Sequence, residues 1–346
     1  MTSQKFWQAV NAALDEELSR DPSVILFGED VGKPGGPFGA SRGLYERFGA
    51  SRVRDTPISE AAITGMAVGA AMCGLRPIVE IMYFDFITLA MDQLVNQAAK
   101  MRYMSGGELT VPMTLMTFSG AGRGSGPQHS QSFESWLGHV PGLSVVYPSN
   151  PEDAKGLLKG AIRSPDPVVF VSSSRLWTVR GEVSSNIDTI PLGQAKIARP
   201  GRDVTIVSWG WAASRCLEAA ELLSLGGVDA EVVDLRTISP LDTATILDSV
   251  ERTGHLAIVH DAPSPYGPGA EICAVVGELG FESLAGPIIR ITPPFAPSPF
   301  SDRLESAFYP TPERIARLVS TSIGRPIPLS DLHAGESHSE REGVRS

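Results

Sequence analysis

The first half of the chain alternates short apolar runs with longer segments that carry helical periodicity. The apolar runs are about four residues long and lie between turn residues, which is typical of buried strands. They predict strands over residues 24–27, 77–81, 113–116, 143–146 and 168–171. Helices are predicted over residues 57–73, 84–102 and 151–163, after an amphipathic helix near the N-terminus. Apolar strands separated by helices indicate a parallel sheet that is covered on both faces.

A polar stretch with several prolines separates this region from a second, shorter alternation. We predict a linker over residues 186–202, where the apolar periodicity stops. The pattern then predicts strands over 204–207, 230–233, 256–259 and 288–291, and helices over 212–225, 243–251, 269–279 and 312–322. The fold class is therefore α/β, with two parallel-sheet domains over residues 1–185 and 203–324. The polar segment 325–346 is predicted to be a disordered tail.

Composition narrows the class of protein. The chain has 346 residues and a formal charge of −10, which fits about two domains and disfavours nucleic acid or an anionic membrane as partner. Cys73, Cys216 and Cys273 are widely spaced, so we expect neither a disulfide framework nor a zinc site. The N-terminal segment does not resemble a signal peptide, and the longest apolar run, 61–74, is too short to span a bilayer. These features predict a cytoplasmic protein.

Glu60 is the first candidate for chemistry. It begins a helix whose next residues are nearly all small or apolar, so this helix is predicted to be buried. Gly65 and Gly69 are costly inside a helix and make sense where another backbone comes close. A buried carboxylate needs a partner, whereas an acid at the start of a surface helix is stabilised by the helix dipole alone. Both interpretations of Glu60 are open.

His129 is the second candidate, in a loop that follows several glycines. Functional residues concentrate on loops, and histidine titrates near neutral pH, although a loop histidine that only bonds to backbone is the simpler interpretation. On the helix predicted over 84–102, Asp85, Asp92 and Asn96 share one side, which is either solvated or in contact with another subunit. Phe86 is either a core residue or a flat ring that faces a planar ligand.

Sequence motifs that bind phosphate or catalytic metals are missing. No GxGxxG follows a strand, no GxxxxGK[ST] occurs, and no histidine–carboxylate cluster resembles a catalytic metal site. The chain therefore offers an acid/base pair but nothing to hold the charged tail of a cofactor.

A series of short segments, in order, matches one family. They are 28–32, 55–60, 74–77, 92–100, 103–107, 128–131, 139–143, 153–158, 234–237, 240–242 and 269–272. Together they resemble the beta subunit of the thiamine diphosphate-dependent decarboxylating component of 2-oxo acid dehydrogenase complexes, over about residues 5–322. Segments 96–107 and 291–300 are most similar to those of pyruvate and acetoin dehydrogenases.

The resemblance implies a pyrimidine-binding domain followed by a transketolase C-terminal-like domain. It also implies a separate alpha subunit, in an α2β2 heterotetramer, that binds the diphosphate and its magnesium ion. Glu60 would bond the aminopyrimidine ring nitrogen, with Ile58 and Phe86 also binding the cofactor, and His129 would assist acyl transfer to a lipoyl group. A potassium ion is implied at the carbonyls of Met113, Ala161 and Ile162 and at Asp166.

The implied function is a pyruvate-like 2-oxo acid or acetoin dehydrogenase, an oxidoreductase with a lipoyl disulfide as acceptor on a lipoyl acyltransferase core. Two segments depart from the family pattern: residues 172–177, where the family has a glutamate and ends in tyrosine, and the proline-rich turn 264–268. Both bear on the substrate or the partner surface. The alternatives are a biosynthetic relative that transfers a two-carbon or acyl unit to a carrier protein, and a non-catalytic assembly subunit.

Overall fold

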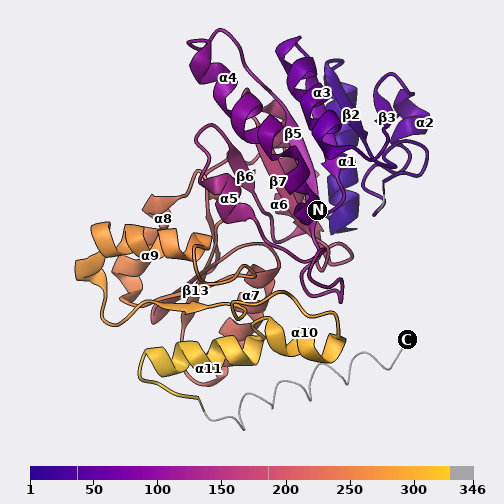
Figure 1. Ribbon diagram of the computed structural model, residues 1–346. Helices are drawn as coiled ribbons and strands as arrows, with labels where there is room; N and C mark the ends of the chain where they lie inside the picture. Colours follow the sequence, from indigo (N-terminus) through magenta and orange to yellow (C-terminus); the bar gives the residue numbers. More distant parts are fainter. Residues whose placement is uncertain (37, 186, 328–346) are drawn as a thin grey trace, which may run out of the picture. The chain divides into compact units, whose positions relative to one another are not determined.

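A computed structural model describes residues 1–36, 38–185 and 187–327 and divides them into two compact units (Figure 1). Unit 1 comprises Met1–Gln194 with two later segments, Arg236–Leu241 and Pro297–Ser301. Unit 2 comprises Ala195–Leu235, Asp242–Ala296 and the chain from Asp302 onward. From residue 328, the predicted tail lies outside the described residues. No helix in the described part is long and apolar enough to cross a membrane.

Unit 1 is built on a seven-stranded sheet with the order β12-β6-β7-β5-β4-β2-β3. Its strands are β2 (Val24–Gly28), β3 (Val53–Asp55), β4 (Arg76–Ile81), β5 (Thr114–Ser119), β6 (Ser144–Val146), β7 (Val168–Ser173) and β12 (Thr237–Ser239). All but β12 pair in parallel, as predicted for strands that are apolar on both faces. A separate antiparallel pair joins β1 (Thr2–Lys5) to β8 (Arg180–Val183).

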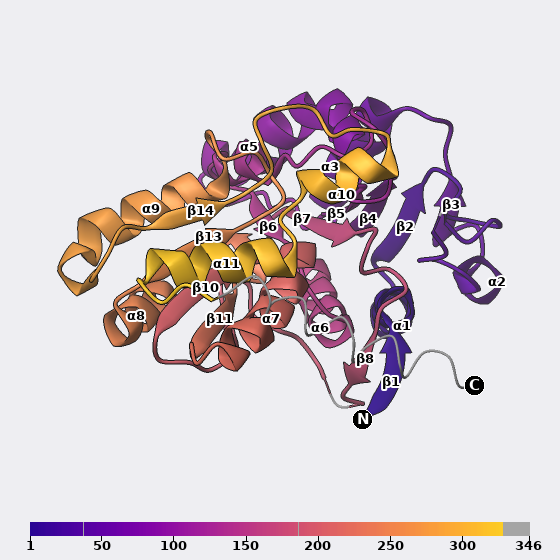
Figure 2. The ribbon, with the colours of Figure 1, turned by 90° about the horizontal axis from the view of Figure 1, so that it is seen from below.

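Helices cover both faces of this sheet (Figure 2). In that view α3 lies above strands β4, β5 and β7, whereas α1 and α6 lie below them. The α-helices of unit 1 are α1 (Phe6–Arg20), α2 (Leu44–Phe48), α3 (Glu60–Met72), α4 (Ala99–Met104), α5 (Glu134–Gly138) and α6 (Pro151–Arg163). The buried residues of α3 include Ile63, Ala67 and Val68, whereas Met66 and Gly69 are exposed. Only one face of the helix predicted to be buried therefore packs into the core.

The single long helix predicted over 84–102 is wrong in detail. The chain there forms a 3-10 helix, η1 (Phe84–Ala90), then a π-helical segment, η2 (Gln93–Ala98), before α4. Changes of helix type of this kind mark local constraints on the backbone and often occur at functional sites. Periodicity alone could not show the break, because all three helix types keep a nearly continuous apolar face.

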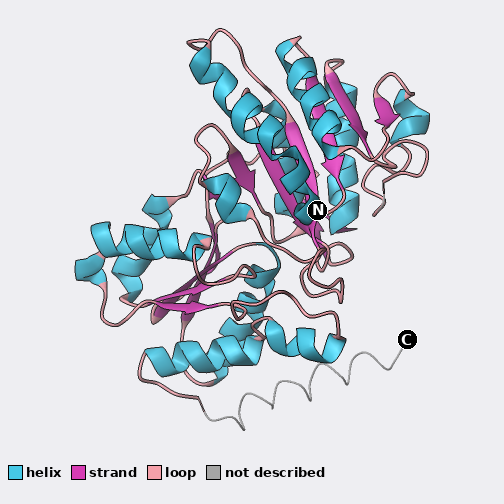
Figure 3. Cartoon of the chain, viewed as in Figure 1, coloured by secondary structure: helices cyan, strands magenta, loops and turns pink. Residues whose placement is uncertain are grey.

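Unit 2 contains a five-stranded sheet with the order β14-β13-β10-β11-β9 (Figure 3). Its elements are β9 (Lys196–Arg199), β10 (Val204–Ser208), α7 (Gly210–Leu225), β11 (Ala230–Asp234), α8 (Thr243–Thr253), β13 (Leu256–Val259), α9 (Pro268–Leu279), η3 (Phe281–Ser283), β14 (Ile289–Ile291), α10 (Asp302–Phe308) and α11 (Pro312–Ser322). Helices α7 and α11 pack together over a core that includes Ile206, Cys216 and Ile315. β9 pairs antiparallel with β11, inside the segment predicted to be a linker.

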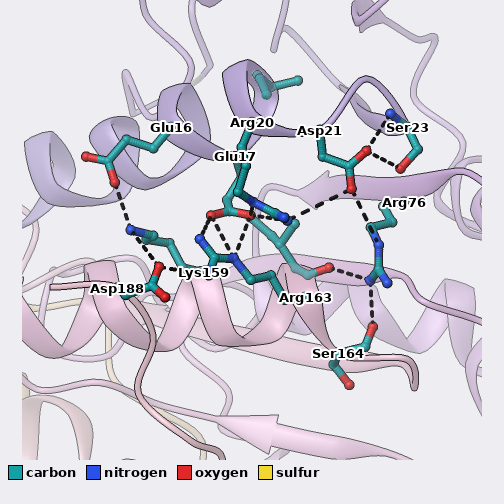
Figure 4. A network of polar contacts seen from close by, with 12 residues as sticks. Glu16, Glu17, Arg20, Asp21, Ser23, Arg76, Lys159, Arg163, Ser164 and Asp188 are labelled. Carbon is teal, nitrogen blue, oxygen red and sulfur yellow. Dashed lines mark hydrogen bonds and ion pairs between the residues drawn. The ribbon is translucent and has the colours of Figure 1, made fainter.

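A network of charged side chains joins α1 to α6 (Figure 4). The side chain of Glu17 is fully buried and accepts hydrogen bonds from Arg163, at 2.7 and 3.1 Å, and from Arg20 at 2.9 Å. Glu16 pairs with Lys155 at 2.6 Å and with Lys159 at 2.9 Å. Partners on both helices thus satisfy a carboxylate that would otherwise be costly to bury.

We expect Glu17→Gln to lower the free energy of unfolding by about 2 kcal/mol, because the two arginines lose their shared counter-ion but still reach solvent. The measurement is urea unfolding followed by circular dichroism. Asp15→Asn is the matched control, since Asp15 lies on the same helix as Glu17 but forms an exposed pair with Arg47 of α2. This substitution should cost under about 1 kcal/mol. Equal effects of the two substitutions would contradict the structural role of Glu17.

Candidate active site

The candidate residues follow the carboxyl ends of neighbouring strands. Glu60 comes after β3, Phe86 after β4 and His129 after β5. Along the chain β2 leads to β3 on one side, whereas β4 leads to β5 on the other side, so the order of the sheet reverses between β2 and β4. Ligands of open α/β sheets bind beyond the carboxyl ends of the strands at such a point. The topology therefore supports a site at the edge where these residues lie.

Glu60 is the first residue of α3 and is only 8% exposed. Among residues 1–36, 38–185 and 187–327, no hydrogen bond or ion pair engages its carboxylate. The dipole of α3 favours a negative charge at this end, but a buried carboxylate without a bonded partner still requires one from outside the chain. Ile58, two residues earlier, is 78% exposed and therefore free to contact a ligand or another subunit.

Two further buried glutamates were not predicted as site residues: Glu29, which is close enough to Glu60 to sense its charge, and Glu80, which is close to Glu29. Glu29 follows β2 and is buried; burial and then the charge of Glu60 raise the pKa of its carboxyl group. Glu80, inside β4, is 1% exposed, and burial followed by the charge of Glu29 raises its pKa to about 8. Carboxyl groups whose environments keep a proton near neutral pH are typical of acid/base sites. The only signal in the sequence was a charge within an apolar strand.

The raised pKa of Glu80 predicts a fall in stability with rising pH. In the unfolded chain this carboxyl group has its ordinary pKa of 4.5, whereas in the native protein its pKa is about 8. The free energy of unfolding therefore falls as the pH rises from 4.5 to about 8. Glu80→Gln should remove this penalty and raise the free energy of unfolding by about 3 kcal/mol at pH 7, with little effect at pH 4. Urea unfolding at pH 4, 6, 7 and 8 measures it.

The control for this experiment is Glu108→Gln, which changes an exposed glutamate of the same unit. It should change the free energy of unfolding by less than about 0.5 kcal/mol at each of these pH values, because surface substitutions away from buried groups usually have small effects. A Glu80→Gln variant with the pH profile of the unmodified protein would show that Glu80 ionises normally in the native state.

His129 lies between two aromatic rings of one segment. Its imidazole makes edge contacts with Tyr83, at 4.7 Å between ring centroids, and with Phe86, at 5.3 Å. A side chain at Gly120, directly after β5, would collide with the His129 carbonyl oxygen, so the loop folds back tightly onto the end of this strand. His129 and Phe86 are thus brought together, and η1, which carries Phe86, packs against α3.

The predicted common side of Asp85, Asp92 and Asn96 does not exist. Asp85 is 4% exposed and bonds to Gln131, whereas Asp92 accepts a hydrogen bond from the Asn96 amide, at 2.7 Å, on the surface. The change from 3-10 to π geometry between them turns the two acids to different environments. Asp85 therefore belongs with the His129 loop.

Each of the four residues implied for potassium already has a hydrogen-bonding or ion-pair partner. The Ile162 carbonyl accepts a bond from the Arg76 guanidinium at 2.9 Å, and Asp166 forms an ion pair with Arg102. The carbonyls of Met113 and Ala161 accept backbone N–H groups of residues 168 and 164. Because cationic side chains occupy two of the four donors, this arrangement does not fit a potassium ion unless both arginines move.

The serine segment that departs from the family pattern ends β7. Ser172, Ser173 and Ser174 are all buried, and the N–H of Ser174 donates to the carbonyl of Ser119 on β5. The hydroxyl groups of Ser119 and Ser174 have no partner within the described residues. The carboxyl ends of β5 and β7 therefore present hydroxyl groups where a carboxylate was expected.

The comparisons with known proteins cover most of the chain. Residues 2–178 match the transketolase pyrimidine-binding domain, and residues 193–315 match the transketolase C-terminal domain. The mitochondrial pyruvate dehydrogenase E1 component subunit beta-2 of Oryza sativa subsp. japonica is 46% identical over 327 residues, which cover 93% of this chain and 87% of the relative. The beta subunit of acetoin:2,6-dichlorophenolindophenol oxidoreductase from Cupriavidus necator is 46% identical over 318 residues, 89% of this chain and 94% of the relative.

Solved structures agree on the fold. A split-gene transketolase, described as an inactive beta4 tetramer, matches with a TM-score of 0.76 at 20% identity, over 92% of this chain and 98% of the other. Transketolase from Leishmania mexicana matches with a TM-score of 0.69 at 18% identity, over 95% of this chain and 47% of the other. These matches confirm the predicted order of a pyrimidine-binding domain and a transketolase C-terminal domain.

Proposed function

The chain belongs to the family of beta subunits of the thiamine diphosphate-dependent component of 2-oxo acid dehydrogenase complexes, and from this premise we propose that it contributes directly to catalysis. The reaction is oxidation of a pyruvate-like 2-oxo acid or of acetoin in a complex with an alpha subunit. The observation that carries the proposal is Glu60, a buried carboxylate at the carboxyl edge of the sheet that no other described residue bonds.

The residues of this chain fit the aminopyrimidine end of the cofactor. Bound thiamine diphosphate supplies a nucleophilic carbon and an electron sink, which is chemistry that no side chain offers. Glu60 would hold a proton against a ring nitrogen of the pyrimidine. Glu29 lies close enough to Glu60 for the charge of Glu60 to raise the pKa of Glu29. Phe86 and Ile58 would contact the ring system, and the alpha subunit would hold the diphosphate and magnesium, for which this chain has no motif.

His129 would act in the second half of the reaction. The 2-oxo acid loses CO₂ and is oxidised to the acyl level, while the lipoyl disulfide is reduced to a dithiol with the acyl group on one sulfur. One proton must reach the other sulfur as the S–S bond breaks. The half-buried imidazole of His129, beside Tyr83 and Phe86, can donate this proton. The expected partners are an alpha subunit in an α2β2 heterotetramer and a lipoyl acyltransferase core, in a reducing compartment such as the cytoplasm.

The test is to co-express the chain with its alpha subunit and to measure reduction of 2,6-dichlorophenolindophenol with pyruvate, longer 2-oxo acids and acetoin. Turnover with one substrate, dependent on thiamine diphosphate and magnesium, is expected from the complex alone. A purified complex that thiamine diphosphate neither activates nor stabilises against heat would contradict the proposal and support an assembly subunit instead.

The serine segment favours one second candidate, in which the acyl unit goes to a carrier protein. Ser172 to Ser174 replace the carboxylate of the family pattern at the carboxyl end of β7, so the buried polar groups at this end of the sheet differ from that pattern. The complex is incubated with substrate and either a lipoyl domain or a phosphopantetheinyl carrier. Mass spectrometry then shows which acceptor gains the mass of the acyl group, and this separates the two functions.

A further inference from the structure

Asp85 is bonded to the loop that carries His129. Its Oδ1 atom accepts a hydrogen bond from the backbone N–H of Gln131, at 3.1 Å, and another from the side-chain Nε2 of the same residue, at 2.8 Å. The carboxylate is buried, with a residue exposure of 4%. Hydrogen bonds to an ionised carboxylate are about twice as strong as neutral ones. Gln131 is thus held firmly from η1, 46 residues away along the chain.

The same short segment contacts His129 itself. Tyr83 and Phe86, on either side of Asp85 in sequence, make edge contacts with the imidazole at interplanar angles of 83° and 87°. Aromatic edge contacts are weak and tolerate sliding, so they do not fix the position of a ring by themselves. The bonds from Asp85 to Gln131, two residues along the loop, supply the anchor that these contacts lack.

The chemistry assigned to His129 depends on such an anchor. A proton donor must lie within hydrogen-bond reach of the atom that it protonates, and a shift of about 1 Å can cost a factor of about 10² in rate. We propose that Asp85 is a positioning residue that fixes the His129 loop through Gln131 for transfer of the acyl group to the acceptor. This inference rests on the function proposed above.

The unused oxygen of Asp85 makes the proposal testable by conservative exchange. Oδ2 has no hydrogen-bond partner within the described residues, so an amide NH₂ in its place loses no bond. In Asp85→Asn, the remaining oxygen still accepts from Gln131. In Gln131→Glu, by contrast, two carboxylates face each other, and combining this change with Asp85→Asn restores a donor–acceptor pair with the roles exchanged.

The experiment uses the reconstituted complex with the alpha subunit and two activities: dye reduction with the 2-oxo acid, and acylation of a lipoyl domain. Asp85→Ala should lower kcat for acylation about 10- to 100-fold, with dye reduction within about twofold of normal. Asp85→Asn should stay within about twofold in both. Gln131→Glu should behave like Asp85→Ala, and Asp85→Asn/Gln131→Glu should recover most of the acylation rate.

Asp242→Ala is the matched control for lost stability. The Asp242 carboxylate also accepts hydrogen bonds from a distant segment, but in unit 2: the backbone N–H of Ala195 donates at 2.8 Å, and that of Thr245 at 3.1 Å. It should lower the melting temperature as Asp85→Ala does and leave the ratio of the two activities unchanged. Parallel loss of both activities in Asp85→Ala, or no recovery in the double variant, would overturn the proposal.

A readout independent of acylation separates this inference from the function it rests on. Diethyl pyrocarbonate modifies exposed imidazoles, and mass spectrometry of the peptide that carries His129 gives its rate. The rate should rise several-fold in Asp85→Ala and return in the double variant. If the unmodified complex acylates no lipoyl domain, the proposed function fails, while this rate still shows whether Asp85 positions His129. An unchanged modification rate, with acylation intact, refutes the positioning role alone.

Discussion

Replacing Glu60 with glutamine is expected to lower dye-coupled turnover of the reconstituted complex by about 10²-fold or more. Glutamine keeps the size of the side chain and can still donate a hydrogen bond, but it cannot gain or lose a proton. Because the buried carboxylate has no bonded partner in the part of the chain that the structure describes, its substitution removes proton handling and breaks no hydrogen bond or ion pair there. The melting temperature should therefore stay the same or rise.

The matched control for this prediction is Glu46→Gln. Glu46 also lies in the first turn of a helix, α2, but it is exposed. It tests the simpler interpretation, in which an acid at a helix start does no more than interact with the helix dipole. Glu46→Gln should leave turnover within about twofold, since dipole interactions at the surface are weak. Near-normal turnover in Glu60→Gln would remove Glu60 from the mechanism and with it the main support for the proposed function.

The sequence predicted the parallel sheets well because buried strands leave a strong signal. β4 and β7 are mostly apolar and buried on both faces, and few alternative structures accommodate such short runs between turns. The edge strands left little signal. β9 and β12 are short and pair antiparallel, and β9 is only half-buried, so neither shows an apolar run. Their pairing depends on a sheet that the local sequence does not describe.

The candidate site was predicted in part for similar reasons. Glu60 stood out because a nearly continuous apolar helix follows it, and His129 because glycines precede it. Glu80 was missed because a charge in a strand usually marks a solvated face, and only the packing of the whole unit shows that it is buried. The bond between Asp85 and Gln131 was missed because contacts between distant segments leave no trace in a single sequence.

Exchanging His129 for asparagine should separate the two halves of the reaction. The amide retains hydrogen bonding but cannot supply a proton, so acylation of a lipoyl domain is expected to fall by about 10²- to 10⁴-fold. Dye reduction bypasses the lipoyl disulfide, so it should stay within about threefold of normal. Mass spectrometry of the lipoyl domain over time gives the first rate, and the loss of dye absorbance gives the second.

His139→Asn provides the matched control, because His139 is an exposed histidine just after α5 and is not one of the rings that contact His129. It should change neither rate by more than about twofold, as surface substitutions outside a site usually do. Equal loss of both activities in His129→Asn would place the imidazole in the first half of the reaction, with Glu60. Full retention of acylation would mean that the acceptor or solvent supplies the proton. The rings of Tyr83 and Phe86, which contact His129, would then shape the part of the site that binds the cofactor.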